Sequence, residues 1–218
     1  MKASRRDKIL DVAVGLAASG GFDSVRQREV AASAGVALGT LYKTFRSKED
    51  ILSAAIDRDA AELERRMERR PARGKTPVDR MVGFFAVMTK QLCKQPHYAR
   101  AVLRAMASGE PEVARNVAVY QGRLNGLIIA AMRGRGRTVT RGAVAAPRPL
   151  TDVTRQKPTH DELVLAQLLQ SLWFSFLVGW SAGLYPEAQI VEHVRTAATL
   201  LQRGIEASNH KKPRGVEA

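Results

Sequence analysis

The residues with the clearest chemical potential lie between positions 26 and 48, and their chemistry suits a polyanion. One face of a short segment carries small, polar and basic residues: Leu38, Gly39, Thr40, Tyr42, Lys43 and Thr44. Hydroxyl and ammonium groups donate to phosphate oxygens, and small residues allow close approach to base edges. An apolar set supplies the opposite, inward face: Val30, Ala34, Val36, Leu41 and Phe45. The pattern predicts a nucleic-acid-binding surface.

The composition of the whole chain agrees with this surface. Its 218 residues have a formal net charge of +14 and a sequence pI near 10.6. Each Lys or Arg that neutralises a phosphate releases a condensed counterion, so nucleic acid is the first expected partner and an acidic membrane the second. A solvated basic tail would give the same net charge.

Other kinds of site have little support in the sequence. Cys93 and His97 have the spacing of a metal pair, but Pro96 interrupts the helix between them and no third ligand follows. We find no paired carboxylates, nucleophile motif or phosphate-binding glycine loop, so we expect no enzyme, metal or cofactor. The single cysteine excludes an internal disulfide, and the first residues lack a signal-peptide pattern. We therefore expect a cytoplasmic protein.

Helical spacing of apolar residues dominates the chain, which predicts an all-α fold. Ser24, Ser47 and Thr159 are expected N-caps, since Gln27, Asp50 and Glu162 follow each by three residues. We expect a flexible basic loop at 134–158 and a disordered tail at 208–218. The expected helices are about 5–19, 24–35, 37–45, 47–69, 77–95, a short one around 102–106, 111 to about 131, 159–184 and 187–207.

Two short helices joined at Gly35 have the geometry that presents a recognition helix to the major groove. The stretch REVAASAGVALGTLYKTFRSKEDIL, residues 28–52, resembles the DNA-binding domain of the TetR family of bacterial regulators. The resemblance covers about residues 5–52. The residues that carry it are Gly35, Val36, Gly39, Thr40, Leu41, Tyr42, Phe45, Ser47, Lys48, Glu49 and Ile51.

The resemblance implies roles for individual residues. Tyr42 and Lys48 would bind phosphates, Lys48 beside the positive end of the fourth helix dipole. Residues placed to meet base edges or nearby phosphates are Gln27, Arg28, Leu38, Thr40, Lys43 and Thr44. Two positions depart from the family pattern: Ala37 replaces a capping serine, and Arg26 replaces a threonine and could bind phosphate by charge.

A second set of residues, apolar and mostly bulky, comes from four of the later helices. Residues of this kind line a ligand cavity or simply fill a core, and the sequence leaves both alternatives open. The resemblance favours a cavity. The set comprises Phe84, Phe85, Met88, Leu92, Met106, Tyr120, Leu124, Leu127, Trp173, Phe174 and Leu177.

Residues 163–185 form a run of 23 positions without a formal charge. This length could span a bilayer, but Gln167, Gln170, Ser171, Ser175 and Ser181 lie within it, so we expect no membrane partner. A helix apolar nearly all round needs cover on every side, which a second subunit can supply. The TetR-like layout implies that the last two long helices pair with their symmetry mates as a four-helix bundle in a homodimer.

Together these patterns predict a three-helix helix-turn-helix DNA-binding domain at 1–50 and a helical ligand-binding and dimerisation domain at 51–207. The expected function is a dimeric transcriptional repressor that a largely apolar effector releases from a palindromic, double-stranded operator. The resemblance extends to the subset that controls steroid and lipid breakdown, so the effector would be a lipid, acyl thioester or sterol. The alternatives are a nonspecific architectural DNA binder and a helical enzyme or carrier with a vestigial DNA-binding head.

Overall fold

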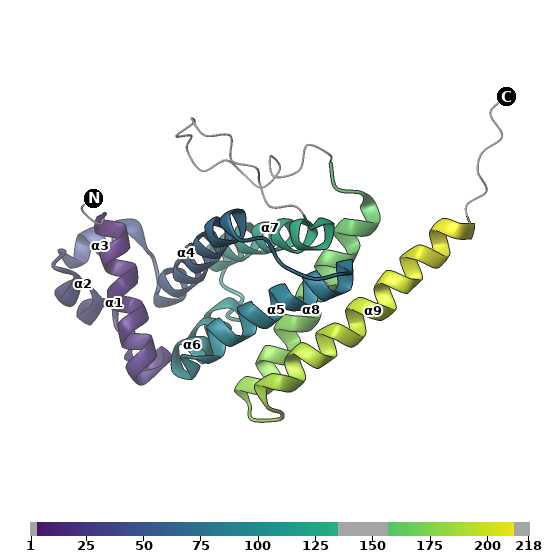
Figure 1. Ribbon diagram of the computed structural model, residues 1–218. Coiled ribbons are helices and arrows are strands. Elements are labelled where there is room, and N and C mark those ends of the chain that lie inside the picture. The colour runs from purple at the N-terminus through teal and green to yellow at the C-terminus, as the bar shows by residue number, and fades with distance from the viewer. Residues whose placement is uncertain (1–3, 135–156, 212–218) are drawn as a thin grey trace.

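The computed structural model describes residues 4–134 and 157–211, and over these ranges the chain is helical without strands (Figure 1). The predicted all-α fold is confirmed. The predicted basic loop and tail fall mainly on residues 135–156 and 212–218, which lie outside the described part. The elements are α1 Arg5–Gly20, the 3-10 turn η1 Phe22–Ser24, α2 Gln27–Ala34, α3 Leu38–Thr44, α4 Lys48–Arg69, α5 Pro77–Cys93, α6 Pro96–Met106, α7 Pro111–Arg133, α8 His160–Ser181 and α9 Glu187–Lys211.

The first three helices form a small head at one end of the molecule (Figure 1). α1 begins with a capping box, in which Ser4 and Asp7 satisfy each other's backbone N–H groups. α1 ends at Gly21, whose φ of 73° suits glycine. α1 packs against α2, η1, α4 and α6. The fully buried core of the head includes Ile9, Leu10, Ala13, Val25, Val30, Leu41 and Ile51.

The predicted start of the second helix at Ser24 is wrong. Ser24 closes the 3-10 turn η1, and α2 begins three residues later at Gln27, with Arg26 at the N-cap and no side-chain cap. Val25 is fully buried between the two elements. Burial of this apolar residue requires an extended step in the backbone, which a continuous helix from Ser24 would not provide.

The predicted caps of the later helices are confirmed. Ser47 accepts a hydrogen bond from the Asp50 N–H at the start of α4, and Thr159 forms a capping box with Glu162 at the start of α8. Pro96 does not end α5; it occupies the first turn of α6, where its missing N–H costs no helical hydrogen bond. α9 continues to Lys211, beyond the predicted end at 207.

α4 is the long connection between the head and the larger helical body, and polar contacts hold it along α7. Ser47 donates to Glu110 at 3.0 Å, and the Asn116 amide donates to Asp50 at 2.8 Å and to Ser53 at 2.9 Å. Further along, the Arg123 guanidinium of α7 pairs with two carboxylates of α4, Asp57 and Glu64. These contacts fix the side of α4 that faces α7.

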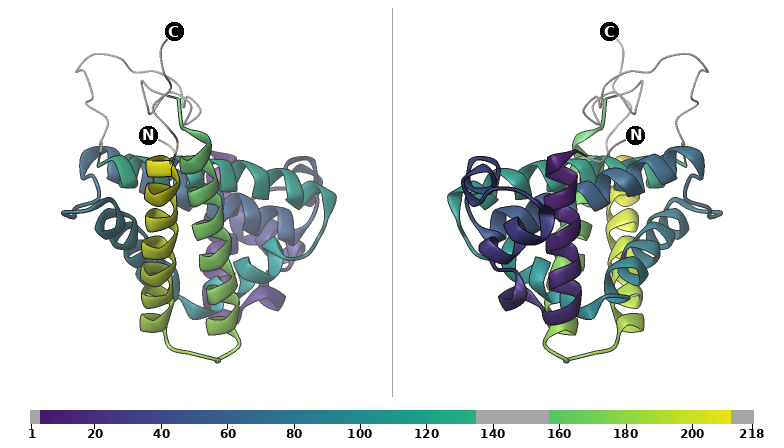
Figure 2. Two further views of the ribbon diagram at one scale, coloured as in Figure 1. Left: turned by 90° about the vertical axis from the view of Figure 1, so that its right-hand side faces the viewer. Right: turned by 90° about the vertical axis from the view of Figure 1, so that its left-hand side faces the viewer.

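α8 and α9 form an outer layer, in which α9 packs along both α5 and α8. In the left view of Figure 2 the two helices run side by side, and no other helix lies in front of them. α8 is long and apolar enough to cross a membrane, with a mean hydropathy of 1.5, and 39% of that window is buried in the fold. Its exposed apolar residues are Leu163, Val164, Leu168 and Val178, and Leu200 of α9 is also exposed.

Candidate DNA interface and ligand cavity

The turn between α2 and α3 presents α3 on the surface of the head. Gly35 has a φ of 66°, and its N–H closes the end of α2 on Ala31 and Ala32. Leu41 and Phe45 are buried and anchor α3, so the rest of this short helix faces outward. The predicted missing cap is confirmed, since Ala37 makes no side-chain hydrogen bond at the start of α3.

The structure brings the predicted DNA-contact residues together on the outer side of α2 and α3. The exposed members are Arg26, Arg28, Gly39, Tyr42, Lys43 and Thr44, and Leu38, Thr40 and Gln27 are half-buried. Tyr42 is 49% exposed, so its ring and hydroxyl are accessible on the outer side of α3. Gln27 is partly engaged, since its amide donates to the Arg46 carbonyl at 3.3 Å.

Gly39 is notable because packing within the chain does not require glycine there. A Cβ built on Gly39 would meet no atom within 4 Å, and its φ is not positive. The space beside Gly39 is therefore open to an approaching backbone or base edge.

Lys48 differs from the other members because it contacts both η1 and, through shared partners, α6. Its ammonium lies 3.6 Å from an Asp23 carboxylate oxygen and 3.9 Å from the centre of the Phe22 ring. Arg104 of α6 uses the same two residues, at 3.3 Å from Asp23 and 4.1 Å from the Phe22 ring centre. We call Phe22, Asp23, Lys48 and Arg104 the head junction. It joins a predicted phosphate-binding residue to the larger body.

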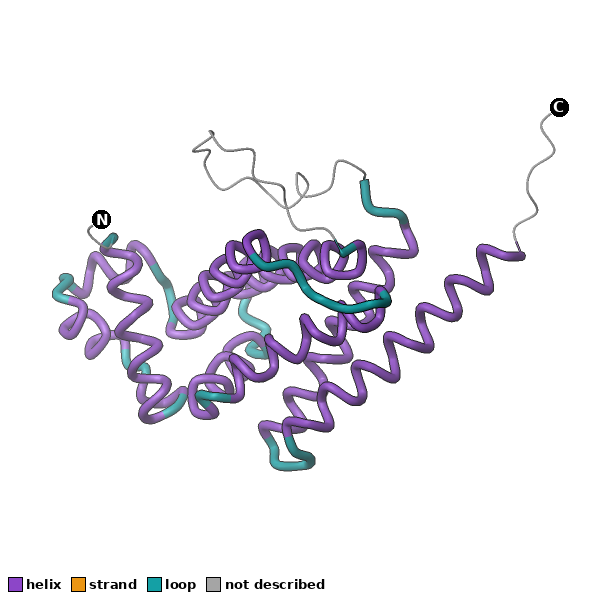
Figure 3. Tube along the Cα trace, in the orientation of Figure 1, coloured by secondary structure: helices purple, strands orange, loops and turns teal. Residues whose placement is uncertain are grey.

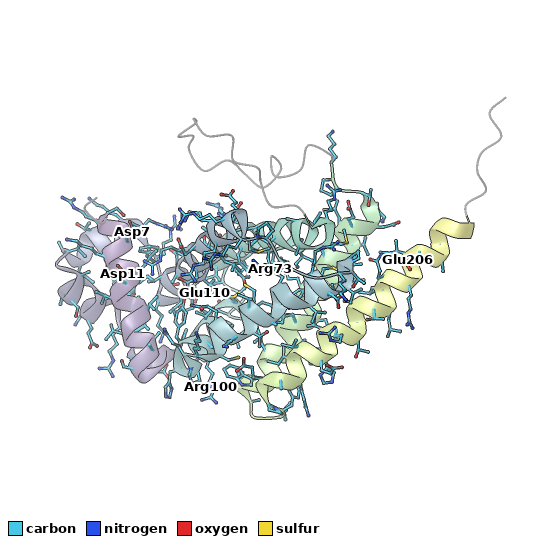
Figure 4. The ribbon with its side chains drawn as sticks, in the orientation of Figure 1. Asp7, Asp11, Arg73, Arg100, Glu110 and Glu206 are labelled. Carbon is cyan, nitrogen blue, oxygen red and sulfur yellow. The ribbon has the colours of Figure 1, made fainter. Side chains whose placement is uncertain are left out.

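A second contact ties α4 to the head. The Arg58 guanidinium donates to Asp11 of α1 at 2.7 Å and to the Asp7 carbonyl at 3.4 Å. Figure 4 labels both acidic residues on α1. A shift of α4 would therefore be transmitted to α1 as well as to η1.

A cavity of about 790 Å³ lies between α4, α5 and the connection that joins them. Residues of α1, α6, α7 and α8 complete its wall. This volume is within the range of sites that take drug-sized molecules. The connection of residues 70–76 passes over the front of the body between α4 and α5 (Figure 3). The lining residues are Val14, Ile56, Asp59, Ala60, Glu62, Leu63, Arg66, Met67, Arg69, Arg70, Pro71, Ala72, Arg73, Gly83, Phe84, Val87, Met88, Gln91, Leu92, Gln95, Tyr98, Tyr120 and Trp173.

The cavity wall includes five of the predicted ligand-site residues: Phe84, Met88, Leu92, Tyr120 and Trp173. Among these, the Trp173 indole N–H donates to Thr89 at 2.9 Å, which fixes the ring. The other six do not line it: Phe85, Leu124, Leu127 and Leu177 are buried core residues, and Met106 and Phe174 are half-buried against that core. Helical periodicity identifies an inward face, but it does not separate the residues that fill the core from those that border a cavity.

Sequence reasoning missed the polar part of the wall. Four exposed arginines, Arg66, Arg69, Arg70 and Arg73, lie at the end of α4 and on the connection that follows it. Figure 4 labels Arg73 in the region where α4 and α5 come together. The signal in the sequence was the cluster of arginines after Glu64, which reads equally well as a solvated helix end. We call these four residues the arginine rim.

Asp59 is the other polar group that the sequence did not single out. It lies on α4, and Tyr98 of α6 donates to its Oδ2 at 2.8 Å. Burial raises the pKa of the Asp59 carboxyl above its ordinary value, although the bond from Tyr98 opposes this. Burial also raises the pKa of Tyr98, so its hydroxyl remains a donor.

α6 connects the two regions. It carries Tyr98 in the cavity wall and Arg104 at the head junction, and Arg100 between them donates to the Ser181 carbonyl at the end of α8 at 3.2 Å. Figure 4 labels Arg100 at the lower edge of the body, near the α8–α9 end.

Known proteins similar to this chain share its N-terminal DNA-binding head. Residues 9–55 match the model of bacterial regulatory proteins of the tetR family. The chain is 31% identical over 197 residues to the HTH-type transcriptional repressor KstR of Rhodococcus jostii (strain RHA1), which covers 90% of this chain and 82% of that protein. The chain belongs to the TetR family. The KstR protein of Mycobacterium tuberculosis is 25% identical over the same length and also covers 90% of this chain.

Solved structures of the family share the fold. A TetR regulator from Rhodococcus sp. RHA1 superposes with a TM-score of 0.75 at 21% identity, covering 90% of this chain and 94% of that one. FadR of Thermus thermophilus, a TetR-family repressor solved in complex with lauroyl-CoA, has a TM-score of 0.67 at 22% identity and covers 98% of both chains. The predicted TetR membership is confirmed, and KstR repressors are among the curated relatives.

Proposed function

We propose that this TetR-family protein is a repressor that binds a palindromic DNA operator as a homodimer and leaves it when an amphipathic effector enters the cavity. The observation that carries the proposal is the position of α4. One end of this helix holds Lys48 at the head junction, and the residues from Ile56 to Arg69 supply one wall of the cavity. A molecule that displaces this wall would also move the head.

The effector class follows from the two parts of the cavity wall. Its interior is apolar and aromatic, with Phe84, Leu63 and Trp173, whereas the arginine rim is cationic. Among the described residues, Arg69, Arg70 and Arg73 make no ion pair, so they are available to phosphates. An acyl thioester of coenzyme A has the matching apolar chain and phosphorylated head. Two neighbours, FadR of Thermus thermophilus and FadR of Bacillus subtilis, were solved with lauroyl-CoA and stearoyl-CoA.

The dimer is proposed from the outer layer. Val164, Leu168 and Val178 are exposed at helical spacing along α8, and Leu200 of α9 is 62% exposed on the same layer. Several large apolar side chains exposed on one layer favour an interaction site there. Pairing of two α8–α9 layers would bury it and hold two α3 helices for adjacent major grooves. A cytoplasmic location follows from this role.

The test combines selection, footprinting and effector titration. DNA bound by the protein is selected from a random pool, and a footprint on the selected sequence should show a discrete palindrome. Lauroyl-CoA should then lower the fluorescence anisotropy of labelled operator, and methyl laurate, which lacks the anionic head, should do so only weakly. Uniform protection without a palindrome would favour an architectural DNA binder, and turnover of the thioester would favour an enzyme.

A further inference from the structure

Two carboxylates line the cavity, Asp59 and Glu62. Glu62 pairs with Arg65 and Arg66, whereas Asp59 lies among apolar residues. Its neighbours along α4 in the cavity wall are Ile56, Ala60 and Leu63, and Tyr120 and Trp173 also line the cavity. More than a third of the Asp59 surface is accessible, although the group is largely surrounded by protein. Asp59 lines the cavity, so part of its accessible surface borders the cavity space. The carboxylate therefore faces the space that an effector would occupy.

Only part of this carboxylate is used by the fold. Tyr98 donates to Oδ2, and among the described residues no hydrogen bond reaches Oδ1. Arg58, the next residue toward the head, is directed to Asp11 of α1 instead. Asp59 is exposed to the cavity, so water can reach Oδ1 while the cavity is empty. An effector that excludes this water must replace its hydrogen bond, because an unpaired carboxylate oxygen in an apolar site is unfavourable. One oxygen thus remains for a donor that the protein itself does not supply.

If the hydrogen bond from Tyr98 to Asp59 served only to hold α6 against α4, its acceptor would not have to be a carboxylate. Tyr98 requires only one acceptor, which a neutral amide or a backbone carbonyl would provide without the cost of burying a charge. A carboxylate gains over an amide when a second donor binds to its other oxygen.

We propose that Asp59, oriented by Tyr98, is a specificity subsite that accepts a hydrogen bond from a hydroxyl group on the buried end of the effector. The proposal deepens the proposed function and rests on it, because it names a feature of the same effector. The effector is then polar at both ends. Asp59 lies on α4, and Arg70 follows eleven positions later at the C-cap of the same helix. The hydroxyl of the effector would therefore lie about 16 Å from its anionic head, measured along the helix axis.

The test uses two probes that differ by one hydroxyl, lauroyl-CoA and ω-hydroxylauroyl-CoA. Trp173 lines the cavity, and the chain has two tryptophans, so a Trp180→Phe background makes Trp173 the reporter of occupancy. Dissociation constants are measured by its fluorescence and by calorimetry on the full chain. The expected result is about tenfold tighter binding of the hydroxylated probe.

Variants distinguish recognition from structural support. Asp59→Leu should reverse the preference between the two probes, and Tyr98→Phe should reduce the ratio of their dissociation constants, whatever its effect on lauroyl-CoA alone. Asp57→Asn is the matched control, because this carboxylate lies two positions away on α4, pairs with Arg123 and does not line the cavity. It should keep the full preference for the hydroxyl.

Equal binding of the two probes, or a preference that survives Asp59→Leu, would overturn the subsite, and so would failure of both probes to bind. Operator release is measured separately by anisotropy. If both probes release operator equally, the proposed repressor function is supported and the subsite is refuted. If the hydroxyl preference is present but neither probe affects DNA binding, the subsite is supported and the proposed mechanism of release is refuted.

Discussion

The Lys48 ammonium lies 3.9 Å from the centre of the Phe22 ring, and Asp23, the next residue, pairs with the same ammonium at 3.6 Å. Arg104 of α6 contacts both residues as well. Attraction to the aromatic ring and to the carboxylate restricts the position of the ammonium group. The head junction therefore holds Lys48 near the start of α4, where the helix dipole also favours an anion.

Asp23→Asn should tighten DNA binding. Asp23 is 77% exposed and competes with phosphate for Lys48, so its neutralisation releases that competition. Since an exposed ion pair contributes at most about 1 kcal/mol, the gain should be up to about fivefold per subunit. Anisotropy with labelled operator measures it. Asp161→Asn, at the start of α8, makes the same charge change far from the head and should have no such effect.

Removing the proposed phosphate contacts should weaken binding to every sequence alike. Tyr42→Phe removes an exposed hydroxyl, and Lys48→Ala should also lower the salt dependence by about one phosphate contact per subunit. Thr40→Ala should instead change the preference among operators. Titrations against a selected operator and a scrambled duplex at several salt concentrations separate the two effects, and unchanged affinity of Tyr42→Phe and Lys48→Ala would refute this docking.

Gly39→Ala should impair DNA binding without harming the fold. A methyl group there meets no atom of the chain, and alanine favours a helix by up to about 1 kcal/mol. A methyl group in a tight interface costs about 1–3 kcal/mol, which is about 5- to 150-fold in affinity. Gly15→Ala is a close control, since Gly15 of α1 is exposed and equally open. Thermal melting should show no loss for either variant, and only Gly39→Ala should lose DNA affinity.

The arginine rim should bind the head of a thioester effector. The double variant Arg70→Gln and Arg73→Gln should bind lauroyl-CoA about tenfold more weakly, because charge-assisted hydrogen bonds to phosphate are lost. Binding of methyl laurate should not change. Calorimetry with both ligands provides the comparison. The double variant Arg115→Gln and Arg203→Gln, at exposed positions of α7 and α9 outside the cavity, controls for net charge. Equal losses for the two ligands would mean that the rim supports the cavity structurally.

Arg123→Met should destabilise the protein by about 2 kcal/mol. The Arg123 side chain is 23% exposed and pairs with both Asp57 and Glu64, so its removal leaves two half-buried carboxylates of α4 without their partner. Urea unfolding measures the change. Arg65→Met removes an exposed pair with Glu62 and should cost no more than about 0.5 kcal/mol. Similar losses in the two variants would contradict this view of the contact between α4 and α7.

α4 begins where the sequence predicts, but the partners of its acidic residues do not follow from the sequence. Its N-cap at Ser47 follows from local chemistry, because Asp50 supplies the bonded N–H three residues later. Asp57 and Asp59 look alike in the sequence, yet the first pairs with Arg123 of α7 and the second lines the cavity. The face that each presents depends on helices distant in the chain, so no local pattern distinguishes them.

The head shows the same division. The motif from Gly35 to Lys48 was sufficient to predict the recognition helix and its outward residues. The start of α2 was not predicted, because Val25 is drawn into the core by α1 and thereby interrupts the helix that Ser24 would have begun. Arg104 contacts Phe22 and Asp23, although Asp23 lies 81 positions earlier in the sequence. Only the tertiary fold brings these residues together.

α6 contributes residues to both the cavity wall and the head junction. Tyr98 and Arg104 are six positions apart, so about 9 Å of helix separates the cavity wall from the head junction. If the cavity takes an effector as proposed, substitutions around Tyr98 can change which molecule it accepts and leave the head junction intact. New effector specificities can then arise at one end of α6 while the other end keeps its contact with the DNA-binding head.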